Sequence, residues 1–131
     1  MTPKETVRAY VDAFNDGDWD RMGELFTPDG EIVGVLGSAP LERALPIWRE
    51  LHEGMTSRLE IVALAEDGEN VAARLRESGR FVGAFRGLAD LEPTGRCYEL
   101  LAMEWFEFSD GRIRRRWGAR DAATLRRQVL G

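Results

Sequence analysis

The longest strand pattern in the chain covers residues 96–120, which read RCYELLAMEWFEFSDGRIRRRWGAR. Apolar and polar side chains alternate along residues 96–108, as expected for a strand with one buried face. Asp110 and Gly111 follow, and an Asp-Gly pair between two strand patterns is a strong hairpin signal. Residues 112–120 then form the second strand. This segment predicts two long antiparallel strands near the end of the chain.

A second hairpin is expected immediately before the first. Residues 58–65 read as a strand, and Val71 begins another in which apolar and polar side chains alternate. The turn between them is residues 66–69, Glu-Asp-Gly-Glu, which has the composition of a hairpin loop. Gly79 and Gly83 interrupt the second strand, so we expect a bend or bulge there. Four strands in sequence predict a long, curved antiparallel sheet.

The first half of the chain has helical periodicity instead. Thr2 can cap a helix, with Pro3 at its first position and Glu5 completing a capping box. One apolar face then recurs at helical spacing, at Val7, Tyr10, Val11 and Phe14. The further elements expected are a short helix at 19–26, a short strand at 31–35, a third helix from about Ala44, which tolerates Pro46 only near its start, and a closing helix at 121–129.

Helices followed by strands indicate the α+β class. We expect a single domain spanning residues 1–131, in which the curved antiparallel sheet wraps around the N-terminal helices as a cone. A bent sheet closed by helices leaves an apolar pocket between them, and such pockets suit small hydrophobic ligands. The 131 residues are 44% hydrophobic and 31% charged, which is enough to build one packed core.

Composition excludes several classes of function. The net charge of −5 argues against a general nucleic-acid binder. The single cysteine, Cys97, and the single histidine, His52, exclude an intrachain disulfide and a multi-histidine metal site. No apolar run reaches the ~18–20 residues of a membrane span, and the polar N-terminus does not resemble a signal peptide. We therefore expect a cytoplasmic protein without a metal site of this kind.

Carboxylates must then carry any acid–base chemistry. Glu104 shares its strand face with the apolar residues Tyr98, Leu100, Ala102, Phe106 and Phe108, and an acid on such a face is typical of a functional site. In general, a carboxyl in an apolar pocket has a raised pKa, because burial disfavours its charged form, and this suits it to proton transfer near neutral pH. The alternative is that Glu104 pairs with an arginine of the next strand.

The last strand offers a second acid. Ile113, Arg115, Trp117 and Ala119 share one face by alternation, and Asp121 continues it. This alternation places Arg115 and Trp117 in the pocket beside Asp121. The alternative for Asp121 is a helix cap, since it precedes the closing helix. Arg80 follows Gly79 at the expected bend and could also enter the pocket.

Several motifs together resemble the SnoaL-like polyketide cyclase (ester cyclase) family, within the nuclear-transport-factor-2-like and ketosteroid-isomerase-like α+β barrels. They span nearly the whole chain: Val7-Arg8-Ala9-Tyr10, Asn15-Asp16-Gly17-Asp18, Leu25-Phe26-Thr27-Pro28-Asp29, Ser78-Gly79, Pro93-Thr94-Gly95-Arg96, and Asp110-Gly111-Arg112-Ile113 with Trp117 and Asp121. Two positions where the family often has histidine are occupied by Phe81 and Gly34.

The resemblance implies a cone of curved sheet with a deep pocket and cofactor-free chemistry on a small hydrophobic substrate. A proton next to a carbonyl would be removed, and an intramolecular aldol-type ring closure would follow. The family's acid/base aspartate falls on Asp121, with Glu104 as its carboxylate partner or a polar anchor. The residues expected to bind substrate are Arg115, Trp117, Arg80, Phe81, Tyr98, Trp48 and Phe14.

Two alternatives remain open. The same pocket could open or hydrolyse an epoxide, with Asp121 and Glu104 as the paired carboxylates. It could also be a binding domain without catalysis, in which Trp48, Trp105 and Trp117 fill the interior. The family resemblance further implies a homodimer, for which a sheet face carrying Leu101, Met103 and Trp105 could serve as the contact.

Overall fold

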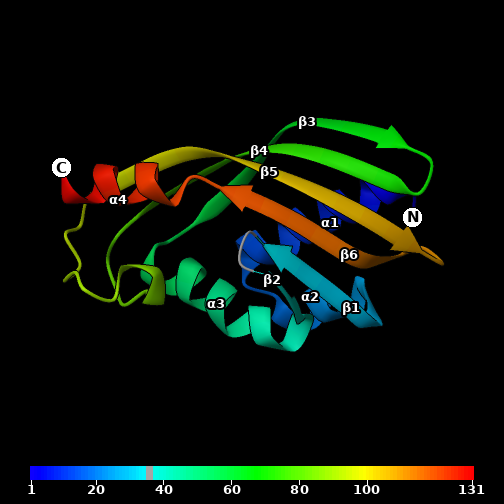
Figure 1. The fold of residues 1–131 in the computed structure, drawn as a ribbon, viewed down its shortest axis with the longest axis horizontal. Coiled ribbons are helices and arrows are strands. Elements are labelled where there is room, and N and C mark those ends of the chain that lie inside the picture. The colour runs from blue at the N-terminus through cyan, green and yellow to red at the C-terminus, as the bar shows by residue number, and fades with distance from the viewer. Residues whose placement is uncertain (35–36) are drawn as a thin grey trace.

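The protein is described here by a computed structural model that covers residues 1–34 and 37–131. Along the chain, helices come first and long strands follow (Figure 1). The elements are α1 (Pro3–Asp16), α2 (Trp19–Glu24), β1 (Phe26–Gly34), β2 (Gly37–Pro40), α3 (Leu41–Gly54), β3 (Arg58–Asp67), β4 (Asn70–Arg80), the short 3₁₀ helix η1 (Arg86–Leu88), β5 (Cys97–Ser109), β6 (Arg112–Arg120) and α4 (Ala122–Leu130).

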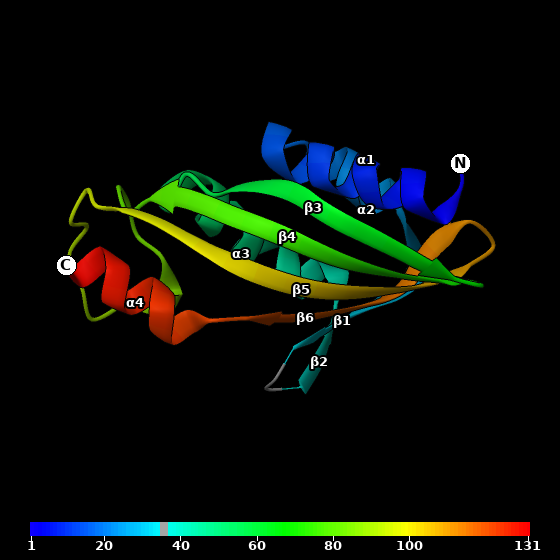
Figure 2. The same cartoon turned by 90° about the horizontal axis from the view of Figure 1, so that it is seen from above.

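One sheet contains the six strands of the described chain, in the order β2-β1-β6-β5-β4-β3, and its two edges do not meet. The long strands β3 to β6 arch over α1 and α3, and Figure 2 shows how they curve along their length. The expected α+β cone is confirmed. The four long strands pair antiparallel as predicted, whereas β1 runs parallel to β6, so the sheet is mixed. The short strand β2 was not predicted.

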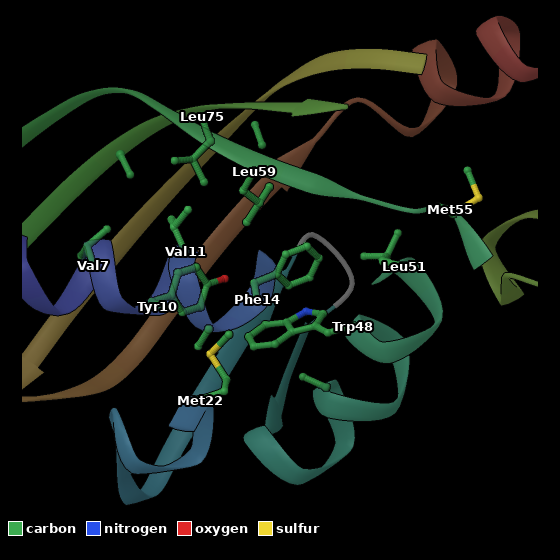
Figure 3. Packing of buried hydrophobic residues seen from close by; sticks show 14 of the residues in the cluster. Val7, Tyr10, Val11, Phe14, Met22, Trp48, Leu51, Met55, Leu59 and Leu75 are labelled. Carbon is green, nitrogen blue, oxygen red and sulfur yellow. The ribbon is translucent and has the colours of Figure 1, made fainter. Parts of the chain in front are cut away.

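Helix α1 forms as its sequence predicts. The Thr2 hydroxyl accepts a hydrogen bond from the Glu5 amide, and the Glu5 carboxylate accepts one from the Thr2 amide. This capping box satisfies two amides that the first helical turn would otherwise leave without partners. The helix buries its apolar face under the sheet, and in Figure 3 Tyr10 and Phe14 of α1 lie next to Trp48 of α3.

Helix α3 begins earlier than expected, at Leu41 rather than near Ala44. Pro40 has extended backbone angles and ends β2, so the chain turns directly from strand into helix there. Pro46 consequently lies inside the helix. Its ring removes one backbone donor, yet the helix continues to Gly54 and buries Trp48 and Leu51 against the core.

A β-bulge in the last hairpin sets which side chains of β6 face the helices. The turn itself is as predicted, with positive φ at both Asp110 and Gly111. The pairing then slips, because Glu107 lies opposite Arg115 whereas Phe108 lies opposite Ile113. One extra residue in β6 reverses the alternation beyond the bulge. The sequence-based prediction of the inward face of β6 is therefore wrong after Ile113.

The structure does not test some of the predictions. Val35, the last residue of the strand predicted at 31–35, lies outside the described residues. Within the described chain, no helix is long and apolar enough to cross a membrane. The single domain, the cytoplasmic location, the lack of a cofactor and the lack of nucleic-acid binding stay predictions.

Candidate functional site

A cavity of about 420 Å³ lies between the inner face of the sheet and the helices α1 and α3. Apolar side chains make up most of its wall, including Phe14, Trp48 and Leu59. Four charged residues also line it, and all four come from the inner face of the sheet: Glu77 of β4, Glu104 of β5, and Arg116 and Arg120 of β6. They form two separate acid–arginine pairs.

The first pair belongs to what we call the Glu104 cluster: Glu104, Arg116 and Tyr10. The Tyr10 hydroxyl donates a hydrogen bond of 2.9 Å to Oε1 of Glu104. Both Nε and Nη2 of Arg116 also contact that same oxygen. Glu104 is 5% exposed, so this carboxylate is almost fully withdrawn from bulk water.

The second oxygen of Glu104 is different. Among the described residues, Oε2 of Glu104 accepts no hydrogen bond. Oε2 is not fully buried either. Among the described residues, Thr27 Oγ1 is the side-chain polar atom that is both fully buried and without a hydrogen-bond partner, so Oε2 keeps some accessible surface. Glu104 lines the cavity, and Oε2 is the carboxylate oxygen that Tyr10 and Arg116 leave open. The carboxylate thus keeps one oxygen for a ligand.

The surroundings fix the protonation of the two partners of Glu104. Burial, with a further contribution from the Glu104 charge, raises the pKa of Tyr10, so this phenol stays protonated at neutral pH. Burial alone would lower the pKa of Arg116. The charge of Glu104 and the contacts with Glu104 and Tyr10 have the opposite and larger effect, so the pKa of Arg116 is raised. Arg116 is therefore a permanent cation, and it lies 5.5 Å from the centre of the Trp48 ring.

Gly118 makes room for this arrangement. A Cβ at this position would lie 2.5 Å from Nη1 and 2.6 Å from Cζ of Arg116, far closer than atoms can pack. The guanidinium of Arg116 therefore lies directly over the backbone of Gly118. Gly118 is the residue of β6 that pairs with Glu104 of β5. With a side chain at this position, the guanidinium of Arg116 would have to shift from the place where it contacts Glu104.

The second pair belongs to the Glu77 cluster: Glu77, Arg120, Tyr98 and Ser57. Arg120 donates from Nε to Oε1 of Glu77 at 3.2 Å and from Nη2 to Oε2 at 2.5 Å. The Tyr98 hydroxyl donates to Oε2 at 2.6 Å and also contacts the Ser57 hydroxyl. Burial, with Glu77 adding to it, raises the pKa of Tyr98. Both oxygens of Glu77 are therefore occupied.

Some of the predicted site residues come together in this region. Glu104, Trp48 and Phe14 line the cavity. Tyr98 is buried behind it, in the Glu77 cluster. The alternative that Glu104 pairs with an arginine of the next strand also holds, with Arg116 as that arginine.

Asp121 is placed elsewhere, and the prediction that it faces the apolar pocket is wrong. It is exposed and caps α4, where its carboxylate accepts hydrogen bonds from the Thr124 amide at 2.9 Å and the Thr124 hydroxyl at 2.5 Å. These hydrogen bonds hold the pKa of Asp121 below its usual value. The alternative interpretation as a helix cap is the correct one, because the bulge and the end of β6 turn this residue outward.

Arg115 and Trp117 lie on the outer face of the sheet rather than in the cavity. Arg115 contacts Glu107 and Glu31 at 3.4 Å each, and Trp117 is 41% exposed beside it. The β-bulge accounts for both corrections. The prediction that Trp117 and Trp105 could fill the interior is also wrong, because the regular alternation along β5 places Trp105 opposite Trp117 on the outer face.

Arg80 and Phe81 also lie away from the cavity. Arg80 is exposed, and its Nε donates to the carbonyl of Gly95 at 2.6 Å. Phe81 is fully buried, and its backbone exchanges hydrogen bonds with the loop before β5. Both residues come directly after Gly79, whose backbone packs closely against the carbonyl of Met55 near the end of β4. Their observed role is to hold this loop.

Five residues of the two clusters were missed by the sequence analysis: Tyr10, Ser57, Glu77, Arg116 and Arg120. Glu77 had a signal, since it shares its strand face with Val71, Ala73 and Leu75, just as Glu104 shares its face with apolar residues. Tyr10 was assigned only to the helix core. The two arginines could not be found without knowing the bulge.

The outer face of the sheet has an apolar groove of about 640 Å³. The exposed large side chains on this face come from β5 and β6 and are between 36% and 59% exposed: Leu101, Met103, Trp105 and Trp117. Small side chains of β3 and β4, including Ala63, Ala65 and Ala72, form much of its floor.

Within the described residues, no group of three or more His, Cys, Asp or Glu side chains could hold a metal ion.

Comparisons with known proteins agree with this fold. The sequence profile of the SnoaL-like domain matches residues 7–116. The chain therefore belongs to the SnoaL-like domain family, as its motifs indicated. A curated relative, the aklanonic acid methyl ester cyclase AcmA of Streptomyces galilaeus, is 32% identical over 112 residues, which cover 82% of this chain and 76% of the relative.

Two solved structures illustrate the similarity in three dimensions. IdmH of Streptomyces antibioticus, named as a candidate polyketide cyclase, superposes with a TM-score of 0.87 at 25% identity over 100% of both chains. AclR of Streptomyces galilaeus, named as a candidate hydroxylase, gives a TM-score of 0.87 at 19% identity over 98% of this chain and 95% of its own. One fold thus carries proteins named for different reactions, so the function must be argued from the site.

Proposed function

We propose that this protein is a cofactor-independent cyclase that closes a ring in a small polyketide-like carbonyl compound. The observation that carries the proposal is the open oxygen of a buried carboxylate, Oε2 of Glu104, in an apolar cavity beside Arg116 and Tyr10. The 32% identity to a curated relative named as a methyl ester cyclase supports the same class of substrate.

In the proposed reaction, Oε2 of Glu104 removes a proton from the carbon next to a substrate carbonyl. The electron pair of the C–H bond moves into the carbonyl, and the guanidinium of Arg116 stabilises the enolate oxygen. The enolate carbon then attacks a second carbonyl carbon of the same molecule and forms the new C–C bond. The resulting alkoxide recovers the proton from Glu104, so the product is an isomer of the substrate.

The partners of Glu104 suit these roles. Tyr10 and Arg116 hold the first carboxylate oxygen, so the second oxygen has a fixed orientation before the substrate arrives. Tyr10, with its raised pKa, remains a neutral hydrogen-bond donor throughout. Trp48 and Phe14 offer apolar surface to a flat substrate. No role in catalysis is proposed for Asp121, Arg115, Trp117, Arg80 or Phe81.

The same geometry favours ring closure over epoxide chemistry. Opening an epoxide with two carboxylates requires one to activate the nucleophile and the other to protonate the epoxide oxygen. Both oxygens of the second cavity acid, Glu77, are taken by Arg120 and Tyr98. Only Glu104 among these two acids keeps an open oxygen.

The test is to incubate the protein with aklanonic acid methyl ester in D₂O. We expect a ring-closed product of the same composition, and deuterium at the reacting carbon of the recovered starting compound. Mass spectrometry and NMR measure both, against a reaction without protein. If neither ring closure nor exchange exceeds that background across a panel of related aromatic polyketide esters, the proposal fails and a binding role is favoured.

We also propose that the outer groove is where two copies of the chain associate. Aromatic and Met side chains are enriched in the buried core of protein interfaces, and a twofold interface brings the same patch of each copy together. Met103, 57% exposed beside Trp105, is the natural position to test. Met103→Lys should convert a dimer to a monomer in sedimentation velocity. A native chain that sediments as a monomer at micromolar concentration would contradict this.

A further inference from the structure

The Glu77 cluster contains a cation that is only partly used. Arg120 contacts Glu77 through Nε and Nη2. A guanidinium has five N–H donors, and among the described residues Nη1 of Arg120 makes no hydrogen bond. The Arg120 side chain is 27% exposed and lines the cavity, whereas its partner Glu77 is only 5% exposed. Glu77 thus fixes the edge of the guanidinium that carries Nε and Nη2, while the edge that carries Nη1 stays open.

We propose that this edge of Arg120 is a second polar subsite, which binds an oxygen acceptor of the ligand far from the reacting carbon. The inference deepens the proposed function and rests on it for the identity of the reacting end. The two ends of the site are set by β6, because Arg116 and Arg120 share the inner face four residues apart. At the usual rise of a strand, their Cα atoms are about 13 Å apart.

The charge balance selects the kind of acceptor. Glu77 already neutralises Arg120, so the Glu77 cluster carries no net charge. A ligand carboxylate at this subsite would bring an uncompensated negative charge close to a buried carboxylate, which is costly. A neutral acceptor, such as an ester or ketone carbonyl, accepts the same hydrogen bond without that cost. The subsite therefore prefers a neutral carbonyl to a free acid.

The two subsites together define the class of ligand. It is a flat, apolar compound with a reactive carbonyl at one end and a neutral carbonyl substituent at the other. Apart from the two clusters, the described residues that line the cavity are mainly apolar, among them Leu51 and Leu59. Fused aromatic rings bearing an ester match this pattern.

The experiment measures binding by isothermal titration calorimetry with three probes that share the same two ring ketones and differ only in the substituent at the end of the ring system: anthraquinone-2-carboxylic acid methyl ester, the free acid, and 2-methylanthraquinone. With the native chain, we expect the ester to bind about tenfold more tightly than methylanthraquinone, as one additional hydrogen bond of about 1.4 kcal/mol would give. The free acid should bind more weakly than the ester.

The matched variant is the double substitution Glu77→Gln and Arg120→Met, which removes both charges together and avoids leaving Glu77 buried without its partner. The advantage of the ester over methylanthraquinone should fall to about unity. In Asp121→Asn, next to Arg120 in the chain but outside the cavity, it should persist. Circular dichroism checks that each variant is folded.

The outcomes separate the subsite from the reaction. No binding of the ester, equal affinity for ester and methylanthraquinone in the native chain, or an unchanged preference in the double variant overturns the subsite. A tenfold preference that requires Arg120, in a protein that shows neither ring closure nor deuterium exchange, supports the subsite and rejects the proposed reaction alone. If the double variant does not fold, the preference for ester over acid and methyl probes in the native chain decides.

Discussion

The two charged clusters of the cavity are made of the same parts and leave different parts unused. Each has one glutamate, one arginine of β6 and one tyrosine. In the Glu104 cluster, the arginine and the tyrosine converge on a single carboxylate oxygen and leave the other open. In the Glu77 cluster, both carboxylate oxygens are occupied and part of the arginine is open instead. One cluster thus presents a base and the other presents a donor.

The largest expected effect comes from substituting the two glutamates separately. Glu104→Gln keeps the shape of the side chain but removes the base, so turnover should fall by about 10²- to 10⁴-fold. Glu77→Gln should leave kcat within about threefold of the native value, well short of the tenfold that a 1.36 kcal/mol change in the barrier would give. It should raise KM, because Arg120 loses the carboxylate that holds it in place. Steady-state kinetics on the ring-closing substrate measures both. Equal losses of kcat in the two variants would contradict the comparison.

The second prediction concerns how Arg116 reaches its glutamate. In Gly118→Ala, the new methyl group would lie 2.5 Å from Nη1 of Arg116, so the guanidinium must move away from Glu104. We expect kcat to fall by about tenfold, which corresponds to about 1.4 kcal/mol of lost transition-state stabilisation. Gly34→Ala is the control, because Gly34 also lines the cavity but no atom of the described residues lies within 4 Å of its added Cβ. A normal kcat in Gly118→Ala would refute this placement.

The third prediction uses the fact that Tyr10 and Tyr98 are the only tyrosines of the chain and Lys4 its only lysine. Both tyrosines have a pKa raised above the ordinary value of 10.0 in the folded protein. Their contribution to stability is therefore complete below pH 10 and is lost as the pH rises, because the unfolded chain releases these protons first. Each should lower the free energy of unfolding by about 1.4 kcal/mol per pH unit above that value.

Urea denaturation between pH 8 and 11 measures this slope, and tyrosinate absorbance follows the ionisation. Tyr10→Phe and Tyr98→Phe should each remove about half of the slope. The two clusters are then distinguished by activity, since Tyr10→Phe should lower kcat and Tyr98→Phe should not. A slope near zero in the native chain would show that the phenols ionise while the protein is folded.

The smallest effect is expected at Asp121. Asn is as good a helix cap as Asp, so Asp121→Asn should leave both the thermal midpoint and turnover nearly unchanged, whereas the resemblance to the family predicts a collapse of turnover. Asp121→Ala should cost about 1 kcal/mol of stability through the lost cap. A kcat reduced more than tenfold in Asp121→Asn, in a folded protein, would return Asp121 to the reaction.

The fold could be predicted from the sequence because its signals are local. The capping box at Thr2 and Glu5, the turn at Asp110 and Gly111, and the alternation along β5 each depend on neighbouring residues only. Glu104 was found in the same way, from one charged residue on an apolar strand face. These signals do not depend on how distant segments pack.

The site was predicted only in part because its remaining residues depend on non-local pairing. A bulge in β6 decides that Arg116 and Arg120 face the cavity and that Arg115 does not. The extra residue is an arginine among arginines, so no change in composition marks it. Asp121 was assigned from the alternation along β6 and from the resemblance, yet its carboxylate is satisfied by Thr124.

The bulge has a consequence for how such a protein can change over time. Deleting one residue near Arg114 would restore the regular pleat and rotate the rest of β6 by half a turn. Arg115 and Trp117 would then point into the interior, and Arg116 and Arg120 would point toward solvent. A single deletion could thus exchange one lining for another without a single amino-acid replacement, which offers a short evolutionary route between different chemistries on one scaffold.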